Sequence, residues 1–266
     1  MSAFLSNLFG SVHWSLSPLQ LLALLSLPTL SVLLSLWRSL HVERDLIEGT
    51  IRTFLQLFIV GLVLHFVFNA NRWWWTALVL AAMVIIASQN AARRGKGFTH
   101  LFRSTTIAIA CGTAVTVALL LGLHIISGQP RYLIPVGGMI VGNAMVACGL
   151  VLNRYREELI DHRAEIEAWL SLGAPPRIAV QRGLGASLRN GMIPTIDQMK
   201  TVGLVTLPGM MTGSILAGAD PLAAVELQIM VMLMLTTAVM VTALVLGELL
   251  LHLSFNAQEQ LRVLTS

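Results

Sequence analysis

The sequence predicts an all-α, polytopic membrane protein with seven transmembrane helices and a helical coupling loop on the cytoplasmic side. Of its 266 residues, 56% are hydrophobic and only 11% are charged, and the mean hydropathy is +0.78. A soluble domain could not cover that much apolar surface with so few charges. The charges gather in short links and in one long stretch, Asn153 to Lys200, which leaves apolar runs between them. We expect one transmembrane domain over residues 1–266, with the coupling loop at about 153–200.

Seven stretches are long enough, or nearly so, to cross a bilayer core of about 30 Å at 1.5 Å per residue. The first has no Lys or Arg ahead of it and no cleavage pattern of small residues, so we expect it to be retained rather than removed as a signal peptide. In chain order the seven stretches are Ser17–Trp37, Thr53–Phe68, Trp73–Ala91, Ser104–Ser127, Tyr132–Leu152, Thr201–Ala219 and Leu227–Gly247.

The basic residues fall almost entirely on one side of this predicted bundle. With seven spans, 15 of the 17 Lys and Arg residues lie on the side that holds the long stretch and the C-terminus, and only Arg72 and Arg131 lie on the other. By the positive-inside rule, the long stretch and the C-terminus are cytoplasmic and the N-terminus is outside. No basic face is interleaved with aromatic residues, so we expect membrane lipid and no nucleic acid among the partners.

The first half of the long stretch has the pattern of an amphipathic helix. Apolar residues recur at helical spacing from Tyr155 to Leu170 with charges between them, and Arg163 and Glu167 can form an i,i+4 ion pair. Gly173 is expected to end this helix.

A second helix should follow, and the two would form a hairpin at the membrane surface. Pro175-Pro176 suits its first turn, and we expect it to end at about Asn190-Gly191. The helix and break over Glu167–Ala174 are a candidate docking element for a separate soluble protein. The alternative is a solvated amphipathic linker.

Two stretches beside the loop carry glycines four residues apart, Gly138 with Gly142 and Gly209 with Gly213. Missing side chains let helix backbones approach closely in lipid. Such glycine pairs can serve close packing between helices of one chain. Alternatively, they form a seam, meaning a helix contact that moves or that joins two subunits. Pro208-Gly209 interrupts the sixth stretch near its middle, and interrupted helices often line substrate paths.

Polar groups within membrane spans are costly and are therefore functional candidates. A polar group within a span can instead serve helix–helix packing, or its side chain can reach the membrane–water interface. The interface is the alternative especially for Glu226 and Glu248, which lie near their helix ends. At the membrane entrances, Arg52 shares a helix face with Gln56, and Asp197 and Lys200 are expected to pair. The polar candidates within spans are Gln56, His65, Asn143, Glu226, Gln228 and Glu248.

The remaining side chains give no catalytic or metal motif. Eight of the 12 methionines lie between Met192 and Met240, where thioethers suit either soft metals or flexible core packing. Cys111 and Cys148 lie in apolar runs and are expected to be buried thiols. We find no phosphate-binding loop, HExxH or GxSxG motif, so ATP-driven transport would need another chain. The metal site stays unassigned, and the path candidates are Gln56, Met139, Asn143, Met210, Met211 and Gln228.

Several segments resemble the Fet-type iron-export ABC transporter permease family, which is related to plant aluminium-tolerance permeases. Glu167-Ala168 followed by Gly173-Ala174 is similar to the coupling-loop motif of ABC permeases, although the Ile-x-Leu-Pro that importers carry downstream is absent. The more specific matches are Glu43-x-Asp45 with Arg52 and Gln56-Leu57, Ile134–Ala147, Ile193–Asp197, Lys200–Leu204, Leu207–Met211, Asp220-Pro221 and Gln228–Val231, so the likeness covers about Val42 to Asn256.

This resemblance implies a permease in the inner membrane that works with a separate ATPase subunit. Two copies of the chain would pair with two ATPases, which would bind ATP and Mg²⁺, while this chain holds no cofactor. The residues implied in ATPase coupling are Glu167, Ala168, Leu172, Gly173 and Ala174. The cargo stays open, because bacterial relatives are linked to iron efflux and plant relatives to aluminium tolerance and nucleotide sugars.

Two other function classes compete with this one. A motor-free secondary transporter or channel would need ionisable groups deep in the membrane, and the sequence offers few. A membrane-embedded enzyme would need a nucleophile or metal motif, which we do not find. We therefore expect no enzymatic activity in this chain.

Overall fold

The computed structural model describes residues 23–70, 72–95, 98, 100–256 and 258–261. These residues are mostly helical and include no β-strand, only two isolated bridges. The all-α prediction is therefore confirmed for them. They fall into two compact units, which meet in the chain between Asn69 and Ala70.

The described part of the first unit contains α3 (Ser26–Arg38) and α4 (Glu43–Ala70). α3 ends at Ser39, which has a left-handed backbone with φ of 51°. The hydroxyl of Ser35 donates a 2.8 Å hydrogen bond to the Glu43 carboxylate and so ties the end of α3 to the first turn of α4. The acidic residues of that first turn also suit the positive end of the helix dipole.

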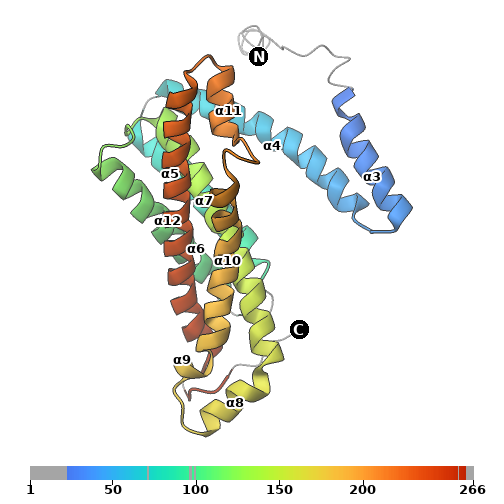
Figure 1. Ribbon diagram of the computed structural model, residues 1–266, viewed down its shortest axis with the longest axis vertical. Coiled ribbons are helices and arrows are strands. Elements are labelled where there is room, and N and C mark those ends of the chain that lie inside the picture. The colour runs from blue at the N-terminus through green and yellow to red at the C-terminus, as the bar shows by residue number, and fades with distance from the viewer. Residues whose placement is uncertain (1–22, 71, 96–97, 99, 257, 262–266) are drawn as a thin grey trace. The chain divides into compact units, whose positions relative to one another are not determined.

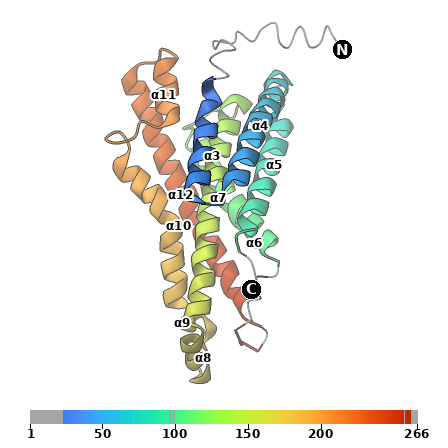
Figure 2. The same cartoon turned by 90° about the vertical axis from the view of Figure 1, so that its right-hand side faces the viewer.

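The second unit is a helical bundle in which two long helices, α7 and α12, contact most of the others. α12 packs against α6, α7, α10 and α11, and α7 packs against α5, α6 and α10 as well. α8 and α9 lie at one end of this bundle and α11 at the other (Figures 1 and 2). Its helices are α5 (Trp73–Ala92), α6 (Leu101–Gly122), α7 (Pro130–Asp161), α8 (Arg163–Ser171), α9 (Pro176–Ala179), α10 (Gln181–Thr201), α11 (Gly209–Leu216) and α12 (Pro221–Ser254).

Two apolar clusters hold this bundle together, one towards each end. Tyr155, Leu159 and Leu250 belong to the cluster nearer α8. Val136 and Met232 belong to the cluster nearer α11. Because α7 and α12 contribute to both clusters, the bundle is continuous along its length.

Glycine allows the closest contact between α6 and α12. A Cβ atom on Gly112 would lie 2.0 Å from the Thr242 hydroxyl and 2.9 Å from the Ala238 carbonyl oxygen. No side chain fits there unless the two helices separate. Gly112 is not one of the glycines that the sequence analysis predicted to allow close helix contacts.

Five helices in the described part of the chain are long and apolar enough to cross a membrane: α4, α5, α6, α7 and α12. They contain the second, third, fifth and seventh predicted stretches in full, and the fourth, Ser104–Ser127, up to the end of α6 at Gly122. The first predicted stretch, Ser17–Trp37, begins outside the described residues, and its described part includes α3, which has 13 residues. Five candidate spans are therefore present, and the predicted seven are not confirmed.

The sixth predicted stretch, Thr201–Ala219, is interrupted at Pro208-Gly209 as predicted, and it is not among the five candidate spans. α10 ends at Thr201, residues 202–208 are non-helical, and α11 has only 8 residues. Pro208 has no N–H to donate and disfavours helical backbone in the residue before it. Gly203 adopts a φ of 82°, in the left-handed region that glycine tolerates best. The non-helical segment is longer than Pro208-Gly209 alone, because it begins directly after Thr201.

The hairpin predicted within residues 153–200 is present, but its second helix is longer than predicted. α10 continues past Asn190 and Gly191 to Thr201, with Pro194 inside it. A Cβ atom on Gly191 would lie 2.5 Å from a Val151 methyl group, so this glycine allows α7 to approach rather than ending the helix. The predicted end at Asn190-Gly191 is therefore wrong.

Candidate functional site

The tip of the hairpin is a short helix closed by a left-handed glycine. The expected ion pair of α8 is present, with Arg163 Nε 2.8 Å from Glu167 Oε1. After α8, the N–H of Gly173 donates to Leu170 O and the N–H of Ala174 to Trp169 O, both at 3.0 Å, and Gly173 has a φ of 84°. This is the Schellman arrangement, which satisfies the last carbonyl groups of a helix.

The chain then restarts at once in α9. Pro175 precedes the helix and Pro176 occupies its first position, where a missing N–H costs nothing. All five residues expected in ATPase coupling, Glu167, Ala168, Leu172, Gly173 and Ala174, therefore lie together at the tip. Their grouping there follows from this local chemistry.

Large apolar side chains point outward at this tip. Leu172 is 82% exposed, Ile178 is 55% exposed and Trp169 is 47% exposed. Glu167 also lies on the exposed surface, beside its Arg163 partner. An exposed apolar patch rimmed by charges marks an interaction surface when it lies in water.

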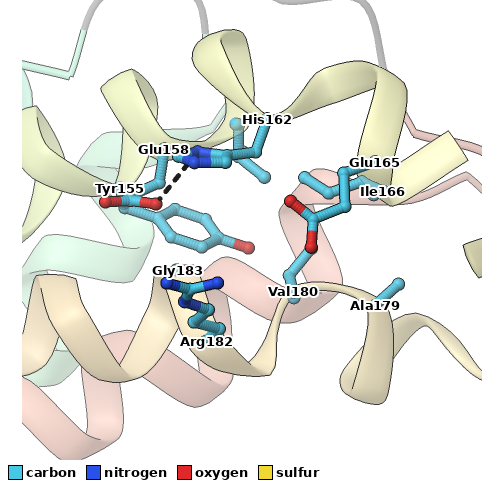
Figure 3. A pocket seen from close by; sticks show the side chains of 10 residues that line it. Tyr155, Glu158, His162, Glu165, Ile166, Ala179, Val180, Arg182 and Gly183 are labelled. Atoms are coloured by element: carbon cyan, nitrogen blue, oxygen red, sulfur yellow. Dashed lines mark ion pairs between the residues drawn. The ribbon is translucent and has the colours of Figure 1, made fainter.

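A charged cluster lies at the base of the hairpin, where α7, α8, α9 and α10 meet. Glu158, nearly buried, binds Arg154 one turn back and His162 one turn on, with His162 Nδ1 3.2 Å from Glu158 Oε2. Glu165 and Arg182 line a small cavity together with Tyr155, Glu158 and His162 (Figure 3). The ion pairs of the charged cluster are local to the end of α7, and the hairpin is held there by the apolar cluster that contains Leu159, Ile166 and Val180.

Two polar links join this region to α12. Ser254 Oγ donates to the buried Tyr155 hydroxyl at 3.1 Å. Arg177 Nη2 on α9 lies 2.6 Å from Glu248 Oε1 on α12, and both side chains are largely exposed. Glu248, which the sequence placed at an interface, is thus paired with the hairpin.

α10 runs antiparallel to α12 along much of its length. The Thr236 hydroxyl donates to Met199 Sδ at 2.9 Å, and a Cβ atom on Gly247 would lie 3.1 Å from Leu188. These two contacts are the same number of residues apart on both helices, so the register is continuous. Met199 therefore lies level with Thr236, near the middle of the predicted span Leu227–Gly247.

The charge pair expected between Asp197 and Lys200 is present. Lys200 Nζ lies 3.9 Å from Asp197 Oδ1, and these residues flank Met199, which contacts the middle of α12, while their place at a membrane entrance stays a prediction. Arg52 pairs with Glu48 at 2.8 Å, within α4. A sequence pattern gave the first pair but could not give its depth.

The predicted path residues are only partly brought together. Met139 and Met210 pack on the same apolar cluster beside α12. Gln228 is 4% exposed, and in the described structure neither its amide nitrogen nor its amide oxygen has a hydrogen-bond partner. Asn143 donates to Met139 O of its own helix at 2.9 Å. Met211 lies on α11, and Gln56 lies on α4 in the first unit.

The predicted glycine seam has little packing in this structure. A Cβ atom on Gly138 would make ordinary contact with Met83, and none of the described atoms lies within 4 Å of such an atom on Gly142, Gly209 or Gly213. Close packing occurs instead at Gly112 and Gly191. The role of the predicted seam between subunits stays a prediction.

The described residues contain no group of three or more His, Cys, Asp and Glu side chains that could hold a metal ion. Cys148 is buried and Cys111 is half-buried, both as free thiols. The residues to which the sequence gave no site role are Glu158, His162, Arg177, Arg182 and Ser254, and it brought Tyr155 forward only as an apolar helix position. The contacts of Tyr155 with Ser254 and of Arg177 with Glu248 join separate helices, whereas Glu158 pairs with His162 at an i,i+4 spacing that was readable beforehand.

Comparison with known proteins places the chain in a family. The model of the "Uncharacterised protein family (UPF0014)" matches residues 18–255. The chain is 40% identical to "UPF0014 membrane protein YjkA" of Bacillus subtilis over 90% of its own length and 97% of the relative's. It is 38% identical to "Probable iron export permease protein FetB" of Escherichia coli, over 90% of this chain and 92% of that protein.

A plant relative shows the same likeness. "Protein ALUMINUM SENSITIVE 3" of Arabidopsis thaliana is 38% identical over 81% of this chain and 79% of its own length. No solved structure matches the chain significantly. The family match covers the described helices from α3 to α12, and the resemblance predicted from the sequence is confirmed. The chain belongs to the UPF0014 family of membrane proteins.

Proposed function

We propose that the chain is the membrane-spanning permease subunit of an ABC transporter that exports metal ions, with iron as the expected cargo. A separate ATPase subunit would bind ATP and Mg²⁺ and supply the energy. Two copies of the chain and two ATPases would form the transporter in the inner (plasma) membrane, with the N-terminus outside and the C-terminus in the cytoplasm. The name of the Escherichia coli relative, an iron export permease, supports this cargo.

The exposed tip of the hairpin is the observation that carries the proposal. Leu172, Ile178 and Trp169 present apolar surface on a rigid turn beyond the bundle. A helix with exposed apolar side chains fits a groove on a partner protein. The Schellman closure and the two prolines fix the shape of this tip before binding, which lowers the entropy lost on docking.

The contacts below the tip suggest how docking would reach the membrane helices. Ile166 of α8 and Val180 belong to the same apolar cluster as Leu159 of α7, which holds the base of the hairpin on α7. Arg177 and Glu248 link α9 to α12. Movement of the tip by the ATPase would therefore act on α7 and α12 together, the two helices that run through both apolar clusters.

Co-purification from membranes with the candidate ATPase tests the proposal. Glu167→Arg and Leu172→Asp should each abolish association. Leu216→Asp is the matched control, since Leu216 is 83% exposed against 82% for Leu172 but lies on α11 at the other end of the bundle. Unchanged association of Glu167→Arg and Leu172→Asp would remove the docking assignment, as would equal loss in the control.

A motor-free secondary transporter or channel is the second candidate, because Asp197 and Lys200 lie alongside the middle of α12. Ionisable groups at that depth are what ion coupling uses. Flux into proteoliposomes driven by an ion gradient, with no ATPase present, would favour this candidate. Flux that requires the ATPase and ATP would favour the ABC transporter.

A further inference from the structure

α10 is a polar helix at a depth where its neighbours are apolar. It lies beside α12, whose stretch from Leu227 to Gly247 has no Asp, Glu, Lys or Arg. On α10, the buried face consists of Ser187, Gly191 and Thr195, each four residues after the last. Small residues at this spacing let α10 lie close to its neighbours. Close packing through this face therefore explains how α10 is held in the bundle although it is polar.

The outward face of α10 carries charges. Arg189, Ile193, Asp197 and Lys200 follow one another at helical spacing, and all four are exposed. By the register of α10 on α12, Arg189 lies near the inner end of the uncharged stretch. Asp197 and Lys200 lie near its middle, with side chains 62% and 70% exposed.

Lipid cannot cover such a face. The middle of the bilayer core lies about 15 Å from water on either side, half of about 30 Å. The four-carbon stem of Lys200 is too short to reach the interface from there, and the carboxylate of Asp197 is held on a shorter side chain still. A charge left in hydrocarbon at this depth is strongly unfavourable, so these residues face water or protein.

The backbone that follows α10 must also face water or protein rather than lipid. Residues 202–208 are non-helical and lie beside the outer half of α12, since Val202 and Met210 pack on the cluster that contains Val231 and Leu235. In the described structure the carbonyl groups of residues 203–205 accept no hydrogen bond, and the N–H groups of Leu207 and Gly209 donate none. Irregular backbone at membrane depth occurs where protein buries it or where it lines a water-filled cavity.

The charges favour water over a dry protein contact. Arg189 has no ion-pair partner among the residues that the structure describes, and burying it unpaired would be costly. Two of the three charges on this face are positive, so a water-filled space beside it attracts negative groups.

From this we propose that the Arg189–Lys200 face of α10 is one wall of a water-filled transport path that takes a cargo bearing negative charge, such as phosphate or carboxylate groups. This inference rests on the proposed transport function and assigns a path and a cargo class to it. An exported metal ion would then pass as a complex with an anionic chelator rather than as a bare cation.

Single cysteines provide the test, in a background where Cys111 and Cys148 are replaced by Ala. Ile193→Cys reports on the proposed wall. Met240→Cys on α12 is the matched control, because both native side chains are 43% exposed and the register places them at nearly the same depth. Lys200→Cys gives a second wall position if Ile193→Cys fails to fold. Membrane vesicles without ATPase are treated with membrane-impermeant methanethiosulfonates, one carrying a sulfonate and one a trimethylammonium group.

We expect the wall cysteine to react at least about tenfold faster than the control, because thiolate forms in water and not in lipid. After correction for each reagent's rate with a small free thiol, the sulfonate reagent should be favoured at position 193 by roughly threefold or more. Adding Arg189→Gln should reduce that preference.

Equal, slow labelling at positions 193 and 240 would overturn the path. So would oxidative cross-linking of position 193 between two copies without labelling, which would make this face a dry subunit contact. Preference for the cationic reagent would overturn the cargo class. Because no ATPase is present, none of these outcomes depends on whether the hairpin docks one.

Discussion

α10 and α12 lie side by side and antiparallel in the same bundle, yet their chemistry is opposite. α12 has 34 residues and is apolar over most of its length, whereas α10 has 21 residues and carries Arg189, Asp197 and Lys200 over the depth where α12 has no charge. Both helices bury small residues against their neighbours. They differ in their outward faces, and this difference teaches that depth in a membrane bundle cannot be inferred from composition alone.

A charge placed on each outward face should break this comparison most clearly. Met240→Asp puts a carboxylate on the apolar face of α12, where it should destabilise the protein in lipid by about 2.5–3.5 kcal/mol. Ile193→Asp adds the same group, at nearly the same depth and exposed fraction, to the charged face of α10, and should change stability by less than about 0.5 kcal/mol.

The measurement is the midpoint of thermal unfolding of the full chain in lipid vesicles, detected as the loss of folded protein with rising temperature. Equal losses for Met240→Asp and Ile193→Asp would mean that lipid covers both faces. The comparison between the two helices would then have no physical basis.

Two glycine-to-alanine changes compare a packed surface with an open one. Gly112 lies on α6 where it packs against α12, and Gly185 lies on an exposed part of α10. Gly112→Ala should destabilise by about 1–3 kcal/mol, because its Cβ would lie 2.0 Å from the Thr242 hydroxyl and 2.9 Å from the Ala238 carbonyl oxygen. Gly185→Ala should stabilise by about 0.5–1 kcal/mol, since Gly185 lies inside α10 and no described atom lies within 4 Å of the new methyl group. Unfolding midpoints in detergent would show opposite shifts, and shifts of the same sign would contradict the packing.

The smallest effect is expected where α12 meets the hairpin. Arg177→Gln removes the ion pair with Glu248 and should cost less than about 1 kcal/mol, because both side chains are largely exposed. Exchanging the two charges in Arg177→Glu with Glu248→Arg should restore most of that loss, while Arg163→Gln gives the size of a local pair for reference. Failure of the exchange to recover stability would show that the pair itself contributes nothing.

Local chemistry explains which parts of the fold the sequence predicted. The ion pair of Arg163 and Glu167, the stop at Gly173 and the restart at Pro176 depend on neighbours a few residues away, and all three are present. α7 and α12 extend beyond their predicted runs at both ends, whereas the length of α5 followed from its apolar run. The end of α10 did not, because Gly191 normally suggests a stop and only contact with Val151 shows that it serves packing.

The site was predictable only where it is contiguous in sequence. Glu167 to Ala174 form one tip, so a motif could locate them. Arg177 and Glu248, or Tyr155 and Ser254, meet only after distant helices pack, and no spacing rule connects them. The depth of Asp197 and Lys200 likewise depends on the register of α10 against α12, since the same residues on an isolated helix would suggest a water-exposed loop.

Because α7 is one continuous helix, a rotation at its hairpin end would move its other end as well. Its 32 residues extend about 48 Å at 1.5 Å per residue. Tyr155 lies near the hairpin and Ile134 near the other end, roughly 32 Å apart along the helix axis. A tilt of about 5° with Tyr155 as the pivot would shift Ile134 by roughly 3 Å, about half a helical turn. A small rotation at the hairpin would thus be enlarged into a displacement comparable to the width of a water molecule at the far end of the bundle.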